Sequence, residues 1–133
     1  MSRSIQPAGW KRPQGYANGV VARGEQICVA GQVGWNADEH FESDDFVDQA
    51  AQALRNVVAV LQAAGAEPAD IVRLVWYVTD KRDFKNSTAR LGEVYRKVIG
   101  PTYPAMTFVQ VAALLEDRAK VEIEATAVRR MEE

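Results

Sequence analysis

Hydrophobic side chains recur at helical spacing along one long segment in the first half of the chain. Between positions 46 and 64 they lie three or four residues apart, which is typical of a helix with one buried face. Hydroxyl and acidic residues at 43–45 precede the segment and Gly65 follows it. These residue types favour the two ends of a helix, so the pattern predicts a helix over residues 46–64.

A second helical stripe ends at Gly100 and Pro101, a pair that stops helices. Its members are Phe84, Leu91, Val94, Tyr95 and Val98. We therefore predict a second helix over residues 84–98.

Five shorter segments are rich in apolar, often β-branched, residues and are bounded by turn residues, so we expect them to be strands. They cover residues 17–23, 26–33, 71–78, 105–114 and 120–129. Only Gly24 and Glu25 separate the first two strands, which predicts a hairpin between them.

The predicted order is β-β-α-β-α-β-β. Each helix is long enough to cross a sheet and return the chain to a parallel neighbour. We therefore expect one α+β domain over residues 1–133, with a mixed sheet and two helices packed on one face.

The other sheet face is predicted to meet protein rather than water. Along residues 105–112 one set of alternate positions includes Thr107 and Val109, and the opposite set includes Met106 and Phe108. Neither set is plainly hydrophilic, and two helices cover only one side. We therefore expect a homo-oligomer in which the open faces pack together.

Composition excludes several classes of function. The 133 residues, 47% hydrophobic and 26% charged, fit one ordinary globular domain. A formal net charge of -2 gives no cationic field, so we expect neither nucleic acid nor a membrane as partner. The chain has one cysteine, Cys28, expected in the core, and no apolar leader or membrane-length run, which favours the cytoplasm.

Two carboxylates share one face of the last strand. Glu122 and Glu124 alternate with Val121 and Ile123, as expected for a half-buried strand. One interpretation is a polar face in contact with water. The other is that either carboxylate lies at a partly dry subunit interface, where its pKa can rise and it can position or deprotonate water.

Four segments occur in the order seen in one known family: PQGYANGV, ICVAGQVGWN, LQAAGAEPADIVRL and YPAMTFVQVAALLEDRAKVEIEATAVRR. From about Tyr16 to Arg130 the chain resembles the reactive intermediate deaminase family, also called RidA or YjgF. The resemblance implies a chorismate-mutase-like α+β fold. It also implies a homotrimer with a central barrel and a cleft between each pair of subunits.

The resemblance further implies hydrolysis of imines or enamines, such as 2-iminobutyrate, to a keto acid and ammonia without cofactor or metal. The family normally has arginine after Pro-Ala to clamp the substrate carboxylate, but this chain has Met106. A thioether carries no charge, so we expect a preference for neutral or aromatic substrates over small carboxylates. The clamp would survive only if another cation, such as Arg73, Arg90 or one from a neighbouring subunit, reached the same place.

By resemblance, Tyr16 and Glu122 are the expected catalytic pair: Glu122 orients water toward the imine carbon while Tyr16 helps to hold the substrate. Trp35, in a loop expected to flank Tyr16, is expected to form part of the cleft wall. The expected substrate-binding residues are Met106, Thr107, Phe108, Gln110, Ala30, Thr88 and Trp35.

Two other interpretations remain. One is that a trimer of the same fold, with Met106 in place of the family's usual arginine, is a non-catalytic small-molecule-binding or chaperone-like protein. The endoribonuclease or translation-inhibitor role also named for this family ranks lower, because the chain has no basic stripe and one histidine, His40. A metal site needs several ligands, so we assign His40 no role.

Overall fold

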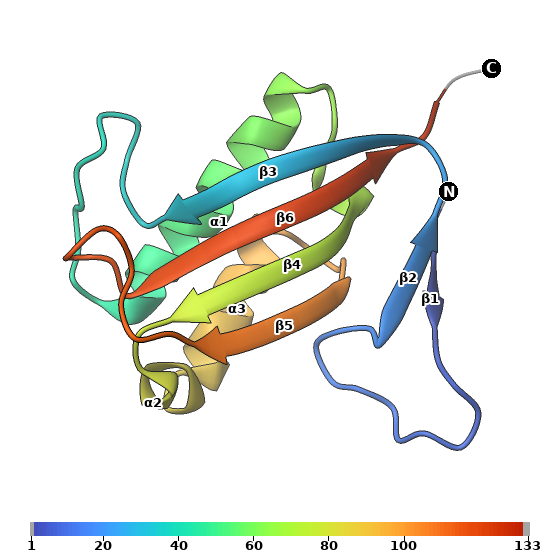
Figure 1. The fold of residues 1–133 in the computed structure, drawn as a ribbon, viewed down its shortest axis with the longest axis horizontal. Coiled ribbons are helices and arrows are strands. Elements are labelled where there is room, and N and C mark those ends of the chain that lie inside the picture. The colour runs from blue at the N-terminus through green and yellow to red at the C-terminus, as the bar shows by residue number, and fades with distance from the viewer. Residues whose placement is uncertain (1, 132–133) are drawn as a thin grey trace.

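The computed structural model describes residues 2–131 and contains a four-stranded mixed sheet (Figure 1). The strand order is β3 (Glu25–Val33), β6 (Val121–Arg129), β4 (Ile71–Val78) and β5 (Ala105–Gln110). β6 is antiparallel to β3 and β4, and β4 is parallel to β5. Two helices, α1 (Phe46–Ala63) and α3 (Thr88–Val98), lie behind the sheet on one side. The predicted α+β class with helices on one face is confirmed.

Helix α1 forms where the hydrophobic stripe predicts it. The side chain of Asp45 accepts a hydrogen bond from the Asp48 amide at 3.0 Å, which satisfies a free N–H of the first turn. Gly65, at φ 76°, follows the last turn in the left-handed conformation that glycine adopts readily. The apolar face of α1 packs on β3 and β6. Within residues 2–131, no helix is both long and apolar enough to cross a bilayer.

The predicted helix over 84–98 is wrong at its beginning. The Asp80 side chain accepts from the Arg82 amide at 2.9 Å and begins a separate short helix, α2 (Lys81–Lys85). The chain turns at Asn86 and Ser87, and α3 begins at Thr88. The turn at Asn86 and Ser87 lies inside the stripe and divides it, because Phe84 belongs to α2 while Leu91 and Tyr95 belong to α3.

The predicted N-terminal hairpin is also wrong. Strand β2 (Gly19–Ala22) pairs with β1 (Ser2–Ile5), a strand the sequence pattern did not suggest, and β3 pairs with β6 instead. Gly24 has φ 149°, and a Cβ there would lie 2.1 Å from the Arg129 carbonyl oxygen. The chain therefore bends sharply at glycine, and the β1–β2 pair forms a sheet of its own (Figure 1).

Strand β5 ends at Gln110, four residues before the predicted end at position 114. Its partner β4 ends at Val78, and the Val111 amide makes one further bond to the Val78 carbonyl oxygen at 2.8 Å. Beyond that point the chain has no neighbouring strand to pair with.

The open face carries the carboxylates, as the alternation predicts. Along β6 every second residue is buried under the helices, while Glu122 and Glu124 lie on the opposite face. Val75 shares their face and is 8% exposed. Cys28 lies there too and is exposed, so its expected place in the core is wrong. It lies on β3, an edge strand, and on the face that the helices leave uncovered.

Candidate functional site

A cavity of about 690 Å³ lies where α3, β5 and the loop before β2 meet. It is on the helix side of the sheet, because Met106 and Phe108 share a face with the buried Trp76. Its lining residues are Gln14, Gly15, Tyr16, Trp76, Phe84, Thr88, Leu91, Gly92, Tyr95, Arg96, Tyr103, Met106 and Phe108.

The backbone fixes Tyr16 beside Met106. The Ala17 amide donates to the Pro104 carbonyl oxygen at 3.0 Å, and Ala17 forms a parallel bridge with Ala105, the first residue of β5. Ala17 is buried, whereas the Tyr16 side chain is 41% exposed. The loop is therefore anchored one residue from a phenol that stays accessible.

Three aromatic rings in contact form the floor of the cavity. The centroids of Trp76 and Phe108 are 4.9 Å apart with an interplanar angle of 22°, and those of Phe84 and Phe108 are 4.5 Å apart. Trp76 is 1% exposed and Phe108 is 38% exposed. The Trp76 indole N–H is buried and has no acceptor among the described residues, so burial and stacking alone hold this ring. The floor thus presents an apolar, aromatic surface.

Two tyrosines form a further part of the wall. The Tyr95 hydroxyl donates to the Thr102 carbonyl oxygen at 2.5 Å, and its ring stacks on Tyr103 at a centroid distance of 5.5 Å. Burial raises the pKa of Tyr95 far above its usual value, so this phenol stays neutral. Tyr103 is 41% exposed at the rim and is held in place by the stack.

The structure places one cation at the cavity, and sequence reasoning missed it. Arg96, in the last turn of α3, is the one charged side chain among the lining residues. Neither candidate named from the sequence lies there. Arg90 pairs with Asp45 at 3.0 Å, and Arg73 lies on the open face beside Glu124. The missed signal was helical spacing, because Thr88, Gly92 and Arg96 fall four residues apart on one side of α3.

Four of the expected site residues line this cavity: Tyr16, Thr88, Met106 and Phe108. The others lie elsewhere in the chain. Gln110 accepts from the Lys81 amide at 2.9 Å and so holds the start of α2. Thr107 lies on the open face of β5, and Ala30 is exposed on the far edge strand β3. Trp35 packs on Phe41 at a centroid distance of 5.8 Å.

Glu122 lies on the open face, on the opposite side of the sheet from the cavity. A Cβ at Gly31 would come within 2.0 Å of Glu122 Oε2, so the carboxylate occupies the space that glycine leaves on β3. Tyr77, its neighbour across the strands, donates a hydrogen bond to Glu124. That bond, with the nearby negative charge, raises the pKa of Tyr77. One chain therefore does not bring Tyr16 and Glu122 into one cavity.

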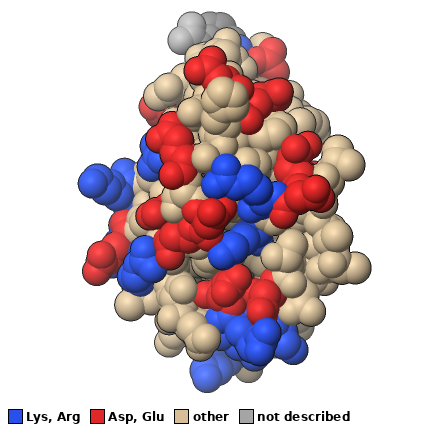
Figure 2. All heavy atoms as spheres, turned by 90° about the vertical axis from the view of Figure 1, so that its left-hand side faces the viewer, with Lys and Arg blue, Asp and Glu red and all other residues tan. Residues whose placement is uncertain are grey.

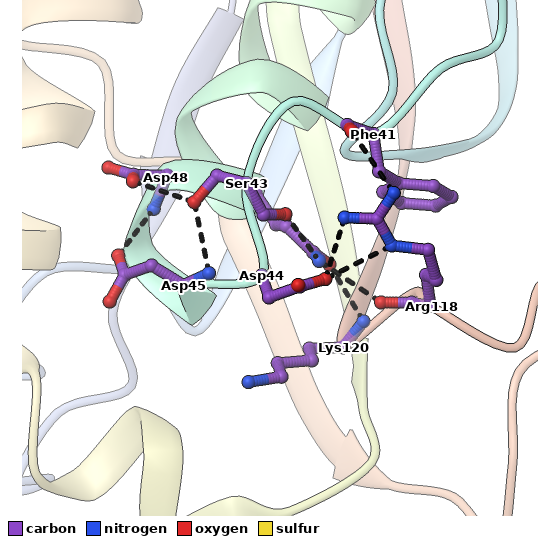
Figure 3. Close-up of polar contacts among 8 residues, drawn as sticks. Phe41, Ser43, Asp44, Asp45, Asp48, Arg118 and Lys120 are labelled. Atoms are coloured by element: carbon purple, nitrogen blue, oxygen red, sulfur yellow. Dashed lines mark hydrogen bonds and ion pairs between the residues drawn. The ribbon is translucent and has the colours of Figure 1, made fainter.

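An acidic cluster at the start of α1 serves the fold (Figure 3). Asp44 pairs with Arg118 at 2.8 Å, and Asp48 accepts a hydrogen bond from Ser43 at 2.8 Å. Asp45, which caps α1, is held with its pKa below the usual value, first by its bond to Arg90. Among residues 2–131, no group of three or more potential metal-ligating side chains is found. On this end of the molecule, Figure 2 shows basic and acidic side chains intermingled rather than one basic surface.

Comparisons with known proteins place the chain in one family. The family model described as Endoribonuclease L-PSP matches residues 10–129. The 2-iminobutanoate/2-iminopropanoate deaminase of Escherichia coli strain K12 is 39% identical over 115 residues, which cover 86% of this chain and 88% of that protein.

Solved structures show the same fold. The crystal structure of the Rid-family protein YyfB from Yersinia pestis, whose function is described as unknown, has a TM-score of 0.85 and 34% identity, covering 96% of this chain and 98% of that one. The YjgF gene product of Escherichia coli has a TM-score of 0.71 and 36% identity, covering 96% and 94%.

Proposed function

The chain belongs to the Endoribonuclease L-PSP family, the RidA/YjgF family, and on that premise we propose that it hydrolyses a reactive imine or enamine other than a small 2-imino acid. Relatives named as imine deaminases support the reaction class. The observation that carries the altered substrate preference is the cavity itself, where Met106 lies in the wall and three aromatic rings form the floor.

The proposed reaction needs one water and no other reactant. The oxygen of water bonds to the imine carbon as the C=N π electrons move to nitrogen, and Glu122 takes a proton from the water. Return of that proton to the nitrogen gives a carbinolamine, and transfer of the carbinolamine's hydroxyl proton to the same nitrogen lets ammonia leave as the carbonyl forms, so imine and water give ketone and ammonia. Tyr16 holds the substrate and assists protonation. An enamine first tautomerises to the imine.

The proposed site is completed by a second copy of the chain. Tyr16 and Glu122 lie on opposite sides of one sheet, so Glu122 must come from a neighbouring subunit to meet the cavity. The uncovered face that carries Glu122 also carries Val109, an apolar side chain that is 39% exposed, and this supports such packing. We propose a homotrimer, the assembly that the family resemblance implies.

Ammonia release tests the proposal directly. Imines are generated in situ by an amino acid oxidase, and their decay is followed with and without the protein. We expect faster decay of the imine of an aromatic keto acid than of 2-iminobutanoate. The Glu122→Gln variant should lose about 10²–10⁴-fold of this acceleration, the range for a general acid-base.

Two results would contradict the proposal. Unchanged ammonia release by Glu122→Gln would remove this residue from the mechanism. No acceleration with any imine, while aromatic ligands still raise the melting temperature, would favour the non-catalytic small-molecule-binding trimer.

A further inference from the structure

We propose that Arg96 is the anion-binding group of the cavity, and that the ligand class is a planar aromatic compound with a carboxylate. This inference deepens the proposed function and rests on it for the reacting group. The cation enters from helix α3, on the wall across from β5, where Met106 leaves no charge.

Charge supports this assignment. The Arg96 side chain is exposed and makes no ion pair or hydrogen bond with any other residue of the described chain. None of the lining residues is acidic, so nothing in the cavity neutralises the guanidinium. An unpaired cation over apolar walls favours an anionic ligand, and a guanidinium binds a carboxylate in a bidentate pair.

Glycine at position 92 fits the same assignment. Gly92 lies inside α3, where glycine is less favourable than alanine, and its backbone does not need the left-handed conformation. A Cβ there would lie 3.3 Å from a terminal nitrogen of Arg96. The absence of a side chain lets the guanidinium fold back along the helix surface over the preceding turn, where both residues line the cavity.

The aromatic part of the ligand follows from the walls. Phe108 is 38% exposed above Trp76, and Tyr103 is 41% exposed on the Tyr95 stack. Such rings favour a planar apolar group by stacking and burial. About 690 Å³ is within the usual size range for a small-molecule pocket and leaves room for a ring as well as a carboxylate.

Binding of three stable probes to the full-length protein tests the inference by calorimetry. Phenylpyruvate is aromatic and anionic, 2-oxobutanoate is anionic only, and phenylacetone is aromatic only. We expect phenylpyruvate to bind at least about tenfold more tightly than either of the others. It alone gains binding free energy both from a charge-assisted hydrogen bond and from burial of its ring. Arg96→Gln should abolish the advantage of phenylpyruvate over phenylacetone.

Lys97→Gln is the matched control, because it removes the same charge from the next residue of α3, which does not line the cavity. It should leave all three affinities unchanged. Circular dichroism checks that each variant is folded.

Equal losses in Arg96→Gln and Lys97→Gln, or an unchanged preference in Arg96→Gln, would overturn the inference. These outcomes are separable from failure of the proposed function. If the probes bind as expected but no imine is hydrolysed, the assignment of Arg96 stands and the deaminase proposal fails. If imines are hydrolysed and Arg96→Gln binds phenylpyruvate normally, only this inference fails.

Discussion

At the scale of single residues, Met106 is the position from which substrate choice is most directly tested. It is half-buried beside Tyr16, where an arginine side chain would face the cavity. We expect Met106→Arg to raise kcat/KM for 2-iminobutanoate at least about tenfold, because a bidentate bond to a carboxylate contributes about 1.5–3 kcal/mol. Steady-state ammonia release measures the change. Met106→Gln, which adds polarity without charge, should show no such gain, and no gain in Met106→Arg would contradict the proposed preference.

Residue-level sequence reasoning found four of the residues that line the cavity. Tyr16, Thr88, Met106 and Phe108 followed from a resemblance that fixes positions along the chain, and all four line one pocket. Arg96 was missed because an exposed arginine in the last turn of a helix is typical of a solvated surface. Only the fold, which brings α3 and β5 to one cavity, shows that its side chain borders that cavity.

At the scale of elements, local signals predicted most of the fold. The stripe of α1 and the alternation of β6 each depend on residues close in sequence. One error is local, since the turn at Asn86 and Ser87 divides the predicted second helix, and the other concerns pairing. Whether β2 pairs with β1 or β3 depends on the bend at Gly24 against Arg129, a contact between residues far apart in the chain. A pattern read along the chain does not contain that contact.

Helix α1 gives a stability prediction at this scale. Asp45→Ala should lower the free energy of unfolding by about 1 kcal/mol at pH 7, because it removes the cap, while Asp45→Asn should cost only a few tenths. Arg90 and the helix amides hold the pKa of Asp45 below its usual 3.8 in the folded state. The stability that the Asp45 carboxylate contributes is therefore complete above the pKa of Asp45 in the unfolded chain. It is lost as the pH falls through the lower pKa of Asp45 in the folded protein. Urea denaturation at equal protein concentration should show that the difference in the free energy of unfolding between wild type and Asp45→Ala becomes smaller below about pH 4. A difference that does not change with pH would contradict this prediction.

At the scale of the whole molecule, the open sheet face makes a single chain incomplete for the proposed reaction. The strand pattern predicted this uncovered face, because both sets of alternate positions along β5 are largely apolar. The structure adds that Glu122 and Tyr16 lie on different sides of the sheet. No pattern along the chain could show this, since the side on which Tyr16 lies is fixed by the bond from Ala17 to Pro104.

Mixing two inactive variants tests whether the site is shared between copies. Tyr16→Phe and Glu122→Gln should each be inactive alone. When the two variants are co-expressed in equal amounts, they should recover about a quarter of wild-type ammonia release. A site between subunits takes its Tyr16 and its Glu122 from two different chains, and each of these chains carries the intact residue in half of the cases. Co-expression of Tyr16→Phe with a Tyr16→Phe/Glu122→Gln double variant is the control and should recover nothing, since no subunit then supplies an intact Tyr16. Recovery fails altogether if both residues must come from one chain. Absence of activity in the mixture, with mixed oligomers confirmed by native mass spectrometry, would therefore place the reaction within a single copy and contradict the shared cleft.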